Sequence, residues 1–114
     1  MKPATATEVA RVADMFAALG STPRVQIIRL LLSAHPDGMV VGDIQSELKI
    51  PNSTLSHHLE KLKSRDLVTV RRDRQFLWYT ANAKALQRLL GFLFAECCSR
   101  NSVVNAQEVV RICL

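Results

Sequence analysis

The sequence predicts a mainly α-helical domain that carries one β-hairpin, an α+β fold within 114 residues. Apolar residues recur at helical spacing through most of the chain. Between residues 67 and 80 the pattern changes to the alternating, β-branched and aromatic residues of two strands. No repeat or long linker divides the chain, and its length suits one domain with a modest core, so we assign residues 1–114 to a single domain.

The first helix is expected over residues 5–19. Thr5 and Glu8 have the spacing of a capping box at its start, and Gly20 ends it. Its apolar stripe consists of Val9, Val12, Met15, Phe16 and Leu19. Thr22 is then expected to cap a second helix, "RVQIIRLLLSA", with Pro23 at the first helical position.

Two shorter helices are expected after the break "HPDG". The first is "VVGDIQSELK", and the second, after the break "IPN", is "STLSHHLEKLKSRD". In the second of these, Leu55, Leu59 and Leu62 repeat at helical spacing and are expected to face the core. The opposite face of that helix is polar.

A hairpin and a long helix complete the prediction. The strands are "LVTVRR" and "FLWYT", joined by the polar turn "DRQ", so arginines cluster at the tip. Asn82 caps a helix over residues 82–99, whose stripe contains Leu86, Leu89, Leu90, Leu93 and Cys97. Residues 100–114 are expected to form a C-terminal tail or a short helix opened by Ser102.

Charge favours a nucleic-acid partner. Lys and Arg number 15 against 10 acidic residues, a net charge of +5, although a solvated basic surface would give the same balance. The low aromatic content of 5% argues against a single-strand binder that stacks bases on rings. No apolar run approaches the roughly 20 residues of a membrane span, and no secretory signal is evident. We therefore expect a cytoplasmic protein with reduced thiols and no membrane partner.

The order of elements indicates a helix-turn-helix, whose second helix can enter a DNA major groove. Side chains that hydrogen-bond base edges or phosphates lie on the polar face of the helix that follows "IPN". These candidate DNA contacts are Asn52, Ser53, Thr54, Ser56, His57 and Lys61. Arg71, Arg72 and Arg74 of the hairpin suit contacts with phosphates or the minor groove.

The segments "LGSTPRVQIIRLLL" and "STLSHHLEKLKSRDLVTVRRDRQFLWYT", with the helix after them, resemble the ArsR/SmtB family of bacterial repressors. The resemblance covers roughly Val9 to Cys98. It implies a winged helix-turn-helix homodimer in which helices 5–19 and 82–99 pack across the two-fold axis. It also implies repression by binding double-stranded operator DNA, with release when an inducer binds.

Carried over by position, the resemblance assigns the recognition helix and the wing. Asn52, Ser53, Thr54, Ser56 and His57 match the face of the recognition helix, and Arg72 and Arg74 match the wing. The sequence departs from the family pattern in two places. Pro51 removes a capping hydroxyl, and Asp66 replaces a Gly that precedes "LV". Asp adopts the left-handed conformation more readily than most residues, so we expect it to be tolerated there.

The resemblance also concerns the site that binds the inducer. The stretch "MVVGDIQ" lacks the Cys-x-Cys motif of arsenic-sensing relatives, and "LQRLLGFLFAECC" lacks the histidines of zinc-sensing ones. Other relatives sense arsenite through an adjacent cysteine pair plus a third cysteine. The resemblance therefore implies that Cys97, Cys98 and Cys113 bind trivalent arsenic or antimony as inducer. If the last segment is a helix that turns back, Cys113 lies about 16 Å from the turn and reaches the pair only from a flexible tail or the partner subunit.

Several alternatives remain open. Cys97 and Cys113 also fit apolar stripes, where free cysteine behaves as a small buried hydrophobe. A thiol-based redox sensor of the same fold ranks lower, because the second helix lacks the cysteine that known redox relatives pair with. A repressor without a metal inducer is a third reading. An enzyme with a cysteine nucleophile is disfavoured, because Cys97 and His57 are expected on distant elements.

Overall fold

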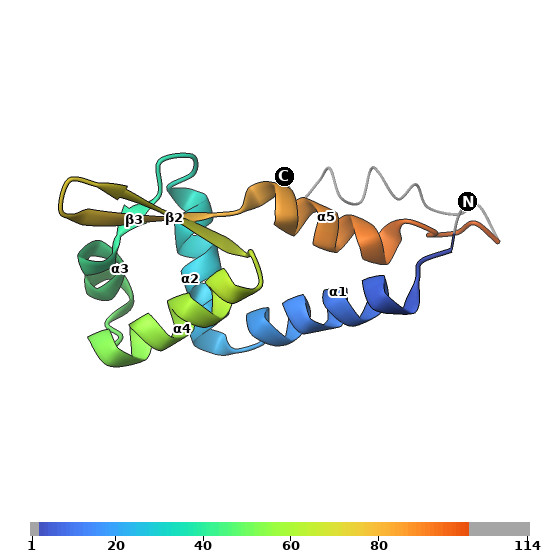
Figure 1. Ribbon diagram of the computed structural model, residues 1–114, viewed down its shortest axis with the longest axis horizontal. Helices are drawn as coiled ribbons and strands as arrows, with labels where there is room; N and C mark the ends of the chain where they lie inside the picture. Colours follow the sequence, from blue (N-terminus) through green and yellow to red (C-terminus); the bar gives the residue numbers. More distant parts are fainter. Residues whose placement is uncertain (1–2, 101–114) are drawn as a thin grey trace.

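The computed structural model describes residues 3–100 and confirms the α+β fold with a hairpin wing. This part of the chain contains five helices and a three-stranded antiparallel sheet (Figure 1). The elements are α1 (Ala6–Leu19), α2 (Thr22–Ser33), β1 (Met39–Val40), α3 (Val41–Leu48), α4 (Asn52–Ser64), β2 (Val68–Asp73), β3 (Phe76–Ala81) and α5 (Ala83–Phe94). The expected helix opened by Ser102 lies outside the described residues.

Side-chain caps begin three of the helices. The Thr5 hydroxyl accepts a hydrogen bond from the Glu8 amide at 3.1 Å, as the capping box predicts. Asn82 caps α5 through the Ala85 amide at 3.2 Å, also as predicted. The predicted cap of α2 was wrong by one residue. Ser21 has the extended backbone of a cap and accepts from the third residue along, so Thr22 is already helical.

A short strand was missing from the prediction. Met39 and Val40 form β1, which pairs with Tyr79 and Trp78 of β3, so the sheet order is β1-β3-β2. The helix predicted from Val40 therefore begins at Val41. A two-residue strand is too short to display alternation, which explains why the pattern did not reveal it.

The core lies where α4, the predicted recognition helix, meets α2, α3 and the sheet. Leu55, Leu59 and Leu62 are buried, as their spacing predicted. They belong to one cluster with the buried residues Ala18, Ile27, Ile28, Leu31, Ile44, Leu67, Val68, Ala81, Leu86 and Leu89. Because every element except β1 contributes to this cluster, the exposed face of α4 is held on a rigid base.

The helix expected over residues 82–99 ends earlier, at Phe94. Residues 95–100 form turns, in which the Cys97 amide donates to the Phe94 carbonyl at 2.9 Å. The backbone of Cys98 is left-handed, with φ of 59°, which a continuous right-handed helix does not permit. Cys97 therefore lies beyond α5 and is not part of its apolar stripe.

Two helices extend away from the rest of the molecule. The dimensions are 51 × 27 × 25 Å, and Figure 1 shows α1 and α5 lying side by side along the long axis. The other helices and the sheet form the opposite end. None of the helices within residues 3–100 combines the length and the apolar character that crossing a membrane requires.

Candidate nucleic-acid interface and thiol site

The helix pair α3–α4 is joined by a tight turn. Lys49 ends α3 in the left-handed conformation, with φ of 54°, and its amide donates to the Gln45 carbonyl at 2.8 Å. Pro51 occupies the cap position of α4 with ψ of 143° and provides no side-chain hydrogen bond. The predicted loss of the cap hydroxyl is therefore confirmed, and the first amides of α4 remain available to an anion such as a DNA phosphate.

The candidate contacts on α4 share one property, which is exposure to solvent. They are Asn52, Ser53, Thr54, Ser56, His57 and Lys61. Leu55, Leu59 and Leu62 on the other face of the helix are buried, so the polar face is directed outward. Their roles in binding DNA stay predictions, but the structure brings them together on one accessible face.

The end of α4 needs an unusual backbone. Asp66 has φ of 58°, as expected from its match to a family glycine. The Asp66 carbonyl accepts from the Asn82 side chain at 2.8 Å. The chain therefore turns directly from the recognition helix into β2 and the wing.

The wing is a tight hairpin. Asp73 pairs with Phe76, which leaves Arg74 and Gln75 as the turn, and Arg74 is left-handed with φ of 59°. Arg72 and Arg74 are exposed. Two guanidinium groups at the tip therefore remain accessible to a polyanion.

Arg71 has a different environment from its neighbours. Its guanidinium carbon lies 5.0 Å from the centroid of the Trp78 ring, the cross-strand partner, which is a cation–π contact. One of its nitrogens also donates to the Asp37 carbonyl at 3.4 Å. Arg71 was predicted to contact DNA, and that role stays a prediction; in the structure its exposed side chain also joins the wing to the loop before β1.

The adjacent cysteines form the second candidate site. The sulfur atoms of Cys97 and Cys98 lie 3.2 Å apart, within hydrogen-bond distance, and both residues are half-buried. The hydrogen bond with Cys98 raises the pKa of the Cys97 thiol, with smaller contributions from burial and from the charge on Cys98. The structure thus brings together two of the three predicted ligands, and Cys113 lies outside the described residues.

The thiol pair does not extend into a larger metal cage. Among residues 3–100, no three or more His, Cys, Asp and Glu side chains are grouped so that they could hold a metal ion. A structural zinc site needs four ligands, which this part of the chain does not assemble. The chemistry available in the described residues is that of a dithiol.

One contact was missed by the sequence analysis. Arg24 of α2 donates to the ring of His58 on α4, with Nη1 and Nδ1 3.1 Å apart, and it also donates through Nε to the Ala18 carbonyl of α1. The two side chains are 34 residues apart in the chain. No local pattern could reveal a contact at that separation.

A recognition helix on a packed core, followed by an arginine-tipped hairpin, defines the winged helix-turn-helix class of DNA-binding domain. Comparison with known proteins agrees. A family described as "Helix-turn-helix domain" matches residues 19–71. The transcriptional repressor SdpR of Bacillus subtilis strain 168 is 30% identical over 80 residues, which cover 70% of this chain and 86% of SdpR. The chain therefore belongs to the helix-turn-helix family of transcriptional regulators.

Two further relatives support this assignment. The nodulation protein NolR of Rhizobium meliloti is 33% identical over 81 residues, 71% of this chain; the match spans 64% of NolR, which is less than two thirds of its length. The homodimeric winged helix-turn-helix DNA-binding domain of Mb0332 from Mycobacterium bovis, a possible ArsR-family regulator, superposes with a TM-score of 0.64. It is 26% identical, and the match covers 91% of this chain and 94% of that one. SdpR is a transcriptional repressor and the Mb0332 domain binds DNA, so these relatives are regulators rather than enzymes.

Proposed function

We propose that this regulator is a cytoplasmic, homodimeric repressor that binds double-stranded operator DNA and releases it when Cys97 and Cys98 bind trivalent arsenic or antimony. The observation that carries the inducer part is the sulfur–sulfur distance of 3.2 Å in a turn directly after α5. The repressor part is supported by SdpR and by the resemblance to ArsR/SmtB repressors.

DNA binding is supported by where the polar and cationic side chains lie. The exposed face of α4 offers hydroxyl, amide and imidazole groups for base edges. Arg72 and Arg74 add charge at the wing, where phosphates or a narrow minor groove can accept it. Together these two elements provide both sequence readout and electrostatic attraction.

Dimerisation through α1 and α5 is supported by exposed apolar surface. Val9 of α1 is 50% exposed and Leu93 of α5 is 59% exposed. A groove of about 1100 Å³ between the two helices is lined in part by Val12, Met15 and Phe92. A second copy of the chain would bury this surface. It would also set two recognition helices about 34 Å apart, the repeat of a palindromic operator.

The all-sulfur ligands favour a pyramidal ion. The 3.2 Å between the two sulfurs is a hydrogen-bond distance between thiols, and it brings both sulfurs within reach of a single ion. Trivalent arsenic and antimony prefer such pyramidal coordination by soft sulfur ligands, whereas zinc prefers a tetrahedral site.

The protonation state also favours a metalloid over a divalent metal. The hydrogen bond with Cys98 raises the pKa of the Cys97 thiol, so the protonated form of Cys97 is favoured. Zinc binds thiolates and must therefore displace thiol protons. Arsenous acid instead condenses with two thiols and releases two water molecules, with no net proton release and no change of oxidation state.

Release of DNA requires that the ion prefer one conformation of the dimer. The thiol turn follows α5, so an ion that fixes this turn can alter how α5 packs against α1 and its partner. Only a difference in affinity between the two states shifts the population, and a coupling of about 1–3 kcal/mol is typical. Cys113, from its own chain or from the partner, would complete a three-sulfur site.

A redox response is the second candidate, because two thiols at 3.2 Å are also placed for mutual oxidation. An external two-electron oxidant would remove two electrons and two protons and form one disulfide. A repressor without any inducer remains the third.

The test uses the full chain and an operator recovered by selection from random duplex DNA. Fluorescence anisotropy follows binding while arsenite, antimonite, zinc or a mild oxidant is added at controlled reductant concentration. We expect release by arsenite or antimonite alone. Cys97→Ser with Cys98→Ser should bind the operator as the wild type does and should no longer release it.

The other outcomes separate the alternatives. Release by oxidant alone would identify a redox repressor, and no release by any agent would identify inert cysteines. If the double variant still responds to arsenite, the inducer site is elsewhere. If the promoter carrying the operator becomes more active when the protein is present, the assignment as a repressor is wrong.

A further inference from the structure

We infer that Arg24 and His58 are a positioning pair that holds the recognition helix against the end of α1, and that protonation of His58 breaks this link and weakens operator binding. The inference rests on the proposed DNA binding but is independent of the cysteines. It assigns a role to two residues that lie outside the predicted DNA-reading face.

Arg24 lies between α1 and α4. Its guanidinium makes two hydrogen bonds in different directions, one to the Ala18 carbonyl in the last turn of α1 and one to Nδ1 of His58, at 3.1 Å. Ala18 is buried, and Arg24 and His58 are both half-buried. A single side chain of α2 therefore connects the end of α1 with the recognition helix.

The contact with Arg24 determines which ring nitrogen of His58 carries the proton. Arginine has only donors, so Nδ1 of His58 must accept, and the neutral ring carries its proton on Nε2. A second proton would go to Nδ1, directly opposite the guanidinium. That protonation removes the acceptor and places two cations within hydrogen-bond distance of each other.

The charged groups around His58 are all positive. Arg24 approaches His58 from α2, and His57 and Lys61 approach it along α4. α1 contributes the Ala18 carbonyl, but this group binds Arg24. Burial first and then these cations lower the pKa of His58, so the folded protein favours the neutral ring that the pair needs.

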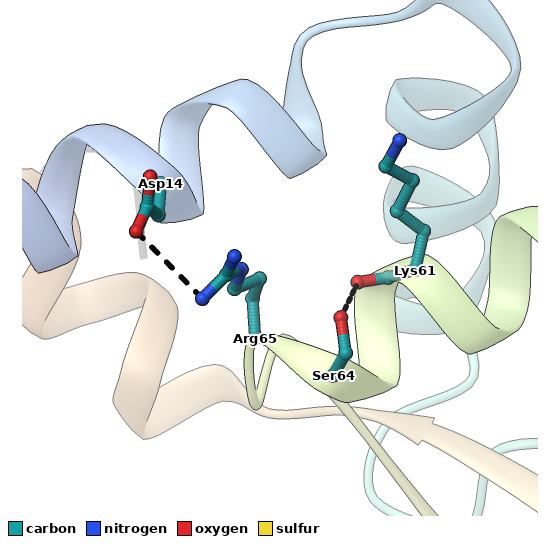
Figure 2. A network of polar contacts seen from close by, with 4 residues as sticks. All are labelled: Asp14, Lys61, Ser64 and Arg65. Carbon is teal, nitrogen blue, oxygen red and sulfur yellow. Dashed lines mark hydrogen bonds and ion pairs between the residues drawn. The ribbon is translucent and has the colours of Figure 1, made fainter.

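The pair affects DNA binding through the position of the recognition helix. Figure 2 shows another contact between α1 and the end of α4. Asp14 of α1 forms an ion pair at 3.7 Å with Arg65, the residue directly after α4. The two side chains are 56% and 49% exposed, so screening by solvent makes it a weak contact. The less exposed Arg24 link therefore does more to fix the recognition helix relative to α1, the helix proposed to contact the partner subunit.

The test compares pH profiles of operator binding by the full chain at constant ionic strength. His58→Asn places an amide oxygen near the position of Nδ1, so it keeps an acceptor that does not titrate. We expect the ratio of wild-type Kd to variant Kd to rise about fivefold between pH 7.5 and pH 5.5, the cost of one net hydrogen bond. The ratio cancels the effects of pH that are common to both proteins.

A ratio that stays constant with pH would overturn the inference. NMR of the ring nitrogens of His58, without DNA, gives a second measurement that does not depend on how the variant folds. We expect Nδ1 to be an unprotonated acceptor at pH 7.5 and to titrate below the usual value of 6.5. Finding the proton on Nδ1 at pH 7.5 would also refute the pair. If the wild type binds no selected DNA at pH 7.5, the proposed function fails, while the NMR result still tests the pair.

Discussion

At the scale of single residues, Gly38 shows how closely the wing is joined to the body. Its backbone has φ of 83°, and an added Cβ would collide with the Tyr79 carbonyl and with Oγ1 of Thr80, at 2.6 Å. Both constraints come from β3, which passes directly against this turn. Only glycine satisfies the backbone angle and the close approach together.

We therefore expect Gly38→Ala to lower the free energy of unfolding by about 1–3 kcal/mol through strain and steric conflict. The matched control is Gly42→Ala, because Gly42 lies in α3 with nothing near its Cβ position. That change should be neutral or stabilise by up to about 1 kcal/mol. Thermal unfolding followed by circular dichroism at one protein concentration measures both. Equal melting temperatures for the two variants would refute the argument.

Single residues also show what sequence can predict. Asp66 was expected to be left-handed from a position match, and Thr5 and Asn82 were expected to cap helices from local spacing. Each of these depends on residues within about one helical turn or on a match to one position. His58 differs, because its partner lies 34 residues away and only the packed fold brings them together.

At the scale of elements, the three arginines of the wing have different environments. All three are exposed, but only Arg71 lies over Trp78 and donates to the loop before β1 among the contacts found in residues 3–100. Side chains alternate between the faces of a strand, so adjacent Arg71 and Arg72 point to opposite sides. The sequence predicts that all three arginines lie near the tip of the hairpin. It does not show which residue lies opposite each arginine, because that depends on the strand register.

The two adjacent arginines should respond differently to removal. Arg72→Ala should weaken operator binding and reduce the slope of log K against log salt by about 1, the signature of one lost phosphate contact. Arg71→Ala should leave that slope unchanged and lower stability by about 0.5–1 kcal/mol, because it removes the cation–π contact. Binding isotherms at several salt concentrations, with thermal unfolding, distinguish them. The division fails if Arg71→Ala reduces the slope as much as Arg72→Ala does.

Element ends were the least predictable feature. The apolar stripe of α5 appeared to continue to Cys97, but the helix stops at Phe94 and turns begin. Apolar spacing shows which face of a helix is buried, but it does not show at which residue the helix ends. This matters for the thiol site, because a turn brings adjacent cysteine sulfurs closer than neighbouring positions on a helix, which point about 100° apart.

At the scale of the whole molecule, exposed apolar side chains occur both on the extended pair α1–α5 and elsewhere. Val9 and Leu93 belong to the extended pair, while Leu32 of α2 is also 41% exposed. Isolated exposed leucines are ordinary, so exposure by itself does not identify an interface. What distinguishes the extended pair is that a groove, lined in part by Val12, Met15 and Phe92, also runs between its two helices, although Val9 and Leu93 do not line it.

We expect Leu93→Glu to shift the protein from dimer to monomer, because it would place a charge in the proposed interface. Leu32→Glu changes a similarly exposed leucine outside that surface and should leave the dimer intact. Light scattering on the eluting peak, across a range of concentrations, measures the mass of each. If both variants keep the dimer mass, the interface does not include Leu93.

The contact of Arg71 with Trp78 has a spectroscopic consequence. The chain contains a single tryptophan, and that residue is half-buried in β3 with a wing guanidinium above its ring. Indole emission depends on the charge and hydration around the ring. All tryptophan fluorescence of the protein therefore originates at the base of the wing. The emission of unlabelled protein should change when the wing moves or when DNA binds to it.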